Sequence, residues 1–119
     1  MKITIPISVG ELLDKISILQ IKSQFTDSHY VLKEKEYLIQ IAKENDVYNQ
    51  EFLNQLLDVN SKLWTIEDQL REFEKNHIFD EEFIRNARLV YITNDKRASI
   101  KKEINKKYNS EYREVKCYA

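Results

Sequence analysis

The 119-residue chain has very little glycine, proline or cysteine, with one residue of each. So few turn-forming residues disfavour a many-stranded β fold and favour long helices. The lone Gly10 excludes the glycine-rich loops that cradle nucleotide phosphates. The lone Cys117 excludes an internal disulfide and a multi-cysteine zinc site, as expected of a protein from a reducing compartment.

An excess of charge of one sign and long apolar runs are also absent. The chain carries 19 basic and 20 acidic residues, so we expect no bulk attraction to nucleic acid or to anionic membranes. No stretch approaches the ~18 apolar residues of a membrane-spanning helix, and residues 1–7 are too short for the apolar core of a signal peptide. With 42% hydrophobic residues, we expect one soluble, cytoplasmic domain over residues 1–119 that does not contact a membrane.

The first residues predict a short strand. Ile3, Ile5 and Ile7 alternate with other residues, and Pro6 confines the strand to a sheet edge because proline has no N–H to donate. The tail, residues 110–119, alternates weakly and could pair with this N-terminal edge strand.

The rest of the chain predicts four helices, over residues 9–24, 29–45, 50–75 and 81–108. Ser8 and Glu11 match a capping box before the first helix, and Asn49 and Asp80 are the expected caps of the third and fourth. About five residues separate the two last, long helices, so these should form an antiparallel hairpin. The expected fold class is therefore all-α, an antiparallel bundle of about four helices with one minor edge strand.

Polar residues lie where a helical core is predicted. At about 100° per residue, one arc of the fourth helix holds Phe83, Ala87, Val90 and Ala98. The polar residues inside or at the edge of that arc are Asn94, Arg97, Lys101 and Asn105. Asn60 and Glu67 interrupt the third helix in the same way, as does Asp14 in the first.

Burying a charge costs several kcal/mol unless it is paired, so these residues need a reason. Three explanations are open. Paired groups such as Glu67 with Arg71 could fix the register of the bundle, as polar residues do in coiled coils. The polar groups could instead line a ligand pocket, or the helical phase could be misjudged, so that they face solvent. The candidate pocket residues are Asp14, Lys15, Asn60, Trp64, Glu67, Arg71, Arg88, Asn94, Asp95, Arg97 and Lys101.

Catalytic and metal-binding patterns are weak. Glu74 with His77 supplies one Glu-x-x-His unit, whereas a di-iron bundle needs two. Glu11 with Asp14 supplies one acidic pair, whereas helical pyrophosphohydrolases hold magnesium with pairs on two helices. Cys117, close to the end of the sequence, has few groups nearby to orient a base. We therefore predict no catalytic residue, no metal site and no cofactor.

Three stretches resemble the motifs of one protein family: residues 5–16 (IPISVGELLDKI), 63–71 (LWTIEDQLR) and 94–105 (NDKRASIKKEIN). Together they resemble a family of small uncharacterised helical proteins found in bacteria and tailed phages. The resemblance implies kinship with a domain of unknown function, and a host-cytoplasmic location if the chain is phage-encoded. It assigns no catalytic residue.

The first functional hypothesis is a non-enzymatic, self-associating adaptor or assembly protein. The first helix is apolar on two nearly opposite sides, one with Leu12 and Ile16 and the other with Ile18 and Ile21. Two such sides call for more burial than a four-helix monomer offers, which predicts a homodimer.

The alternative is a helical enzyme or sensor that binds a small anion, such as a phosphosugar, nucleotide or dicarboxylate, in an interhelical pocket. Arg88, Arg97 and Lys101 would clamp its oxygens, with Glu67 and Asp95 as acid and base. Nucleic-acid binding is less favoured, because the basic residues at the end of the fourth helix point in several directions and fit the favourable charge at a helix C-terminus.

Overall fold

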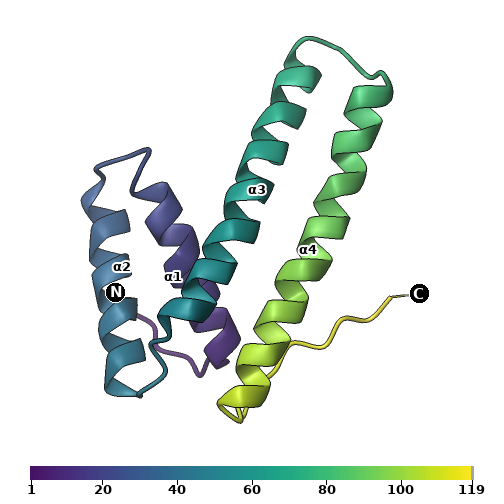
Figure 1. Ribbon diagram of the computed structural model, residues 1–119. Helices are drawn as coiled ribbons and strands as arrows, with labels where there is room; N and C mark the ends of the chain where they lie inside the picture. Colours follow the sequence, from purple (N-terminus) through teal and green to yellow (C-terminus); the bar gives the residue numbers. More distant parts are fainter. Residues whose placement is uncertain (119) are drawn as a thin grey trace.

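The computed structural model describes residues 1–118, which form four α-helices (Figure 1). They are α1 (Val9–Lys22), α2 (His29–Glu44), α3 (Gln50–Lys75) and α4 (Glu81–Lys107). α1 and α2 form a short antiparallel hairpin, and α3 and α4 form a longer one that projects past it (Figure 1). The predicted all-α bundle with a long final hairpin is confirmed, and the expected helix ends are within two residues of those observed.

Three of the helices begin at the predicted caps. Ser8 Oγ accepts a hydrogen bond from the N–H of Glu11 at 3.1 Å, and Asn49 Oδ1 accepts one from the N–H of Phe52 at 3.0 Å. Asp80 caps α4 with its Oδ1 atom in the same way. Each cap satisfies backbone donors that have no partner inside the first helical turn.

The ends of α2, α3 and α4 are made without glycine. Asp46, His77 and Asn109, each two residues past a helix, have φ values of 56°, 55° and 48°. Asp and Asn tolerate this left-handed region better than most residues. The N–H of Val47 then donates to the carbonyl of Ala42 at 2.9 Å, and equivalent bonds close α3 and α4. A chain with one glycine can therefore still stop its helices sharply.

The core is centred on α1, which lies between α2 and the α3–α4 hairpin. Leu13 and Ile16 of α1 are fully buried, together with Leu53 and Leu56 of α3 and Ile104 of α4. Both apolar sides of α1 are thus covered within the chain itself. Burial of α1 therefore does not by itself require a second copy, because α2 and the α3–α4 hairpin cover the helix from two sides; the predicted homodimer stays a prediction.

The predicted N-terminal edge strand is also wrong. Across residues 1–118 no β-strand forms. The two end segments meet where Ser110 binds Val9, and from there they diverge to opposite sides of the bundle (Figure 1). With Pro6 unable to donate and no second strand beside it, the N-terminal segment has no ladder to join. It runs extended instead, with Lys2 Nζ above the ring of Tyr37 at 4.8 Å. The tail that was expected to pair with this strand includes residue 119, which lies outside the described residues.

The helical phase of α4 differs from the prediction. The side that packs on α3 carries the buried residues Asn86 and Thr93, and Asn86 Nδ2 donates to Gln69 Oε1 at 3.2 Å. The predicted arc is turned partly away from α3. Lys101 and Asn105, in this arc, contact α1. Phe83, in the same arc, still packs edge-on against Phe73 of α3, with ring centroids 6.3 Å apart, but Ala87 is exposed. This happens because α1 ends at Lys22, whereas α3 and α4 continue past it and have only each other to pack against.

Candidate functional site

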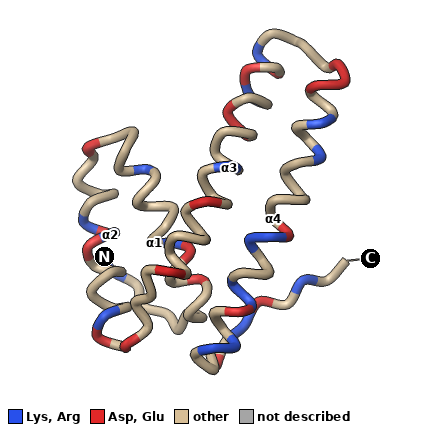
Figure 2. Tube along the Cα trace, in the orientation of Figure 1, with Lys and Arg blue, Asp and Glu red and all other residues tan. Residues whose placement is uncertain are grey.

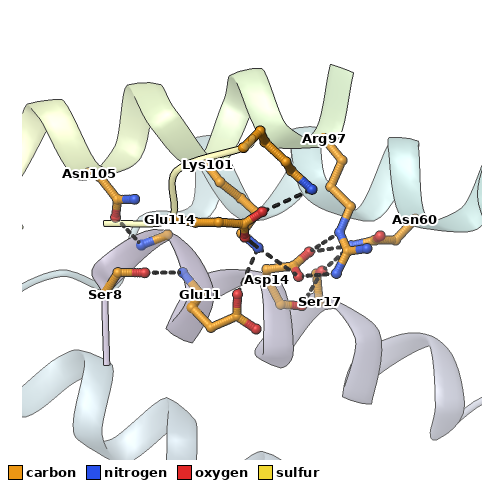
Figure 3. Close-up of polar contacts among 11 residues, drawn as sticks. Ser8, Glu11, Asp14, Ser17, Asn60, Arg97, Lys101, Asn105 and Glu114 are labelled. Atoms are coloured by element: carbon orange, nitrogen blue, oxygen red, sulfur yellow. Dashed lines mark hydrogen bonds and ion pairs between the residues drawn. The ribbon is translucent and has the colours of Figure 1, made fainter. Parts of the chain in front are cut away.

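Asp14 is a fully buried carboxylate at the centre of the bundle. Arg97 Nε donates to Oδ1 at 3.0 Å, and Arg97 Nη2 donates to Oδ2 (Figure 3). Asn60 Nδ2 also donates to Oδ1, at 2.9 Å. The α1 carboxylate therefore binds one side chain of α3 and one of α4, and a two-point guanidinium contact of this kind is both strong and directional.

Asn60 and Ser17 complete the hydrogen bonding around Asp14. Asn60 Nδ2 donates to Ser17 Oγ at 2.8 Å, and the Ser17 hydroxyl donates to the backbone carbonyl of Asp14 at 2.7 Å. Both side chains are buried. Buried polar groups remain costly unless they are satisfied, and here each one has a partner.

Lys101, one helical turn after Arg97 on α4, lies close to three carboxylates. Its Nζ lies 2.7 Å from Glu11 Oε2, 3.3 Å from Glu114 Oε2 and 3.9 Å from Asp14 Oδ2, and its side chain is 11% exposed (Figure 3). Glu11 thus completes an interhelical ion pair. Of the two bonds that define a capping box, residues 1–118 form the one from the Glu11 N–H to Ser8 Oγ but not the return bond from the Ser8 N–H to the Glu11 carboxylate, so this part of the prediction is wrong. We call Glu11, Asp14, Arg97 and Lys101 the ionic cluster; its two acids and two bases balance in charge.

Gly10 lets the start of α1 approach the backbone of α4. Its N–H donates to Asn105 Oδ1 at 2.7 Å, and a Cβ atom at this position would lie 2.7 Å from the carbonyl oxygen of Lys101. Any other residue would therefore push the two helices apart. The neighbouring N–H of Val9 donates to Ser110 Oγ at 3.1 Å, so the chain just past α4 also binds the start of α1.

The electrostatics follow from these contacts. The hydrogen bond with Asp14 raises the pKa of Arg97 above its ordinary value, more than burial lowers it. In the tail, the hydrogen bond from Lys116 and then the charge of Lys101 lower the pKa of Glu114. Glu114 in turn raises the pKa of Lys116. Each of these three shifts favours the charged form of its group, Arg97, Glu114 or Lys116, as expected for members of ion pairs.

A cleft of about 920 Å³ lies beside the ionic cluster, between the C-terminal half of α4, the start of α1 and the tail. It is lined by Glu11, Asn94, Asp95, Arg97, Ala98, Ser99, Lys101, Lys102, Asn105, Arg113, Glu114, Val115, Lys116 and Tyr118. Sites for small molecules usually have about 300–1,000 Å³, so the cleft has the size of one.

The structure divides the predicted pocket residues into three groups. Asp14, Asn60, Arg97 and Lys101 meet in one polar network. Asn94 and Asp95, together with Arg97 and Lys101, line the cleft. The remaining predicted residues lie apart from both: Lys15, Trp64, Glu67, Arg71 and Arg88.

The residues of the third group have other positions. Trp64 stacks on Phe25, with ring centroids 5.2 Å apart, where the α1–α2 turn meets α3. Glu67, Arg71 and Arg88 are exposed on the projecting part of the α3–α4 hairpin. Within the described residues, the expected ion pair between Glu67 and Arg71 does not form, because their side chains face solvent on α3, where an exposed pair gains little.

Several residues of the site were missing from the predicted pocket, namely Gly10, Glu11, Ser17, Asn105, Ser110 and Glu114. A signal for some of them was present. Glu11 and Asp14 are three apart, and Arg97 and Lys101 are four apart, so each pair shares one helix face. Two acids on one helix face and two bases on another are compatible with a double ion pair, although this spacing does not select these two helices as partners. Nothing in the sequence places the tail beside them.

Comparisons with known proteins give one match. A family model covers residues 1–119, the whole chain, and describes a family of unknown function (DUF6165). No curated protein and no solved structure matches. The resemblance to a family of unknown function is therefore confirmed, and its occurrence in bacteria and phages stays a prediction. In the structure, the first and third motifs meet: Gly10, Glu11 and Asp14 contact Arg97, Lys101 and Asn105.

Proposed function

Because the chain belongs to a family without an assigned function (DUF6165), we propose its function from geometry: it is a non-enzymatic assembly protein that self-associates. The surface proposed to bind a second copy is the uncovered, α1-facing side of the projecting α3–α4 hairpin. We define this distal face by Ile84, Ala87 and Tyr91 of α4 and by Glu67 and Arg71 of α3.

The observation that carries the proposal is a row of exposed apolar residues. Tyr91 and Ile84 precede Asn105 by two and three heptads, so they continue the side of α4 that binds α1. Each is 56% exposed, because α1 has ended and nothing in the described chain covers them. Large apolar residues aligned on one helix side usually mark an interface.

Charge complementarity favours a second copy as the partner. Glu67 and Arg71 follow Asn60 by about two and three turns of α3, so they flank the same uncovered side. Within residues 1–118 neither forms an ion pair. In a two-fold symmetric dimer, Glu67 of one copy can meet Arg71 of the other, and the contact occurs twice. The net charge of −1 opposes such an association very little.

The ionic cluster supports a non-enzymatic assignment. Asp14 is fully buried and bound at both oxygens, and Glu11 is paired with Lys101 at 2.7 Å. A general acid or base must reach a substrate proton at hydrogen-bond distance. These two carboxylates are engaged with cations of the same chain, and their geometry is that of a structural joint between α1 and α4.

A charge-swap experiment tests the dimer. In sedimentation velocity, Glu67→Arg and Arg71→Glu should each weaken self-association by about tenfold or more, because each places like charges opposite one another twice. The double variant should restore it. Lys62→Glu, on an exposed part of α3 that pairs with Asp58, is the matched control and should leave it unchanged. Equal behaviour of all variants would exclude this interface.

The cleft supports a second candidate function, the binding of a small anion. Among its described lining residues five are basic: Arg97, Lys101, Lys102, Arg113 and Lys116. A nucleic acid is a poorer candidate. Basic residues do gather on the C-terminal half of α4 (Figure 2), but Arg97 and Lys101 are bound to acids of the same chain. Within residues 1–118 no helix is both long and apolar enough to cross a bilayer.

A further inference from the structure

We propose that Glu114 occupies the place of a ligand's oxyanion in the cleft, and that a small molecule bearing a carboxylate or phosphate binds Lys101 by displacing it. This inference rests on the second candidate function, the binding of a small anion. To that function it adds three points: the ligand binds Lys101 Nζ, the ligand bears a carboxylate or phosphate, and Glu114 of the same chain competes with it.

Lys101 is the anchor because of where its ammonium lies. The Nζ atom is 2.7 Å from Glu11 and 3.3 Å from Glu114, and the lysine lines the cleft. Glu11 approaches it from α1, the helix at the centre of the core. Glu114 approaches the same ammonium from the tail, and both carboxylates line the cleft (Figure 3). The two carboxylates therefore differ in how firmly the fold holds them.

The tail is held weakly beyond its first residues. Ser110 is buried and binds Val9, and Arg113 Nε donates to the carbonyl of Ser110 at 2.9 Å. Past Arg113 the contacts are exposed: Glu114 is 47% exposed, and it pairs with Lys116, which is 48% exposed. Half-exposed ion pairs add little stability, so an incoming anion has little to overcome when it replaces Glu114.

The charges around the cleft favour an anionic replacement. Glu114 pairs with Lys101 and Lys116, so its departure frees Lys116. Outside the ionic cluster, which is balanced in charge, the cleft lining then carries the cations Lys102, Arg113 and Lys116 against the single acid Asp95. A carboxylate or phosphate oxygen at Lys Nζ forms the same kind of charge-assisted hydrogen bond that Glu114 forms now. Ala98, Val115 and Tyr118 offer apolar contact for the remainder of the molecule.

The test uses NMR titration of the full chain with two probes, inorganic phosphate and succinate, which separate a phosphate ligand from a dicarboxylate. Glu114→Gln removes the competing charge, and Glu111→Gln, an exposed tail carboxylate outside the cleft lining, is the matched control. At least one probe should shift the amide signals of residues 97–102. It should bind Glu114→Gln about fivefold more tightly than the wild type or Glu111→Gln.

The other outcomes overturn the inference in distinguishable ways. Equal affinity of a probe for the wild type and Glu114→Gln would show that Glu114 does not compete, while the anion site itself would stand. If neither probe shifts these signals even in Glu114→Gln, both the inference and the second candidate function fail. Lys102→Gln, a change at an exposed lining residue outside the ionic cluster, should weaken any binding that is observed.

Discussion

Asp14 and Arg97, 83 positions apart in the sequence, bind each other through two parallel hydrogen bonds in the interior of the protein. Asp14 has no solvent exposure, and the Arg97 side chain keeps 27% of its own. The pair joins the middle of α1 to the C-terminal half of α4. Since α1 also contacts α2 and α3, the pair fixes the helix at the centre of the core relative to the long hairpin.

The first prediction concerns this pair. Asp14→Asn keeps the shape of the side chain but leaves Arg97 without its counter-charge, so the free energy of unfolding should fall by about 3 kcal/mol. Urea unfolding followed by circular dichroism measures the change. Asp58→Asn, which breaks an exposed pair with Lys62, is the control and should cost about 0.5 kcal/mol or less. A loss at Asp14 no larger than that of the control would disprove a structural role.

The second prediction concerns the close approach at Gly10. Gly10→Ala places a Cβ atom 2.7 Å from the carbonyl oxygen of Lys101, and backbone atoms cannot move aside as a flexible side chain can. Alanine favours a helix by up to ~1 kcal/mol over glycine, but the steric cost of ~1–3 kcal/mol should outweigh it. We therefore expect a lower melting temperature and faster hydrogen exchange at the Gly10 position. An unchanged or higher melting temperature would contradict the packing described.

Local signals in the sequence were sufficient to predict most of the fold. The caps Ser8, Asn49 and Asp80 each lie one residue before a helix begins, as predicted, because a capping bond depends only on neighbours along the chain. The phase of α4 was not predictable in the same way. Its side facing α3 carries polar Asn86 and Thr93 as well as apolar Phe83. Its uncovered side carries apolar Ile84 and Tyr91, so hydrophobicity alone does not distinguish the two sides.

The candidate site was predictable only in part. Polar residues within apolar arcs are easy to recognise, which is how the sequence identified Asp14, Asn60, Arg97 and Lys101. The sequence did not show which of these residues bind one another. With 19 basic residues in the chain, no local pattern selects Arg97 as the partner of Asp14. The tail was missed because the contact between Glu114 and Lys101 depends on the direction in which the chain leaves α4. Only the tertiary structure fixes that direction.

The third prediction concerns pH. Lys116 and Lys101 lower the pKa of Glu114, so its ion pairs are complete above its ordinary value of 4.5 and are lost as the pH falls through the lowered pKa. A carbon-detected NMR titration of the Glu114 carboxyl should give a midpoint below 4.5. Lys116→Gln removes the largest cause and should raise that midpoint, whereas Lys62→Gln should not. A midpoint that Lys116→Gln leaves unchanged would show that the tail pair does not form.

The mass of the protein in solution tests the proposed self-association most directly. Multi-angle light scattering should give a value that approaches twice the 14.3 kDa of one chain at high protein concentration and falls toward 14.3 kDa on dilution. The Ile84→Glu and Tyr91→Glu double variant, which places charges on the distal face, should remain at 14.3 kDa while keeping its helical content. A wild-type chain that stays at 14.3 kDa even at high micromolar concentration would contradict the proposal.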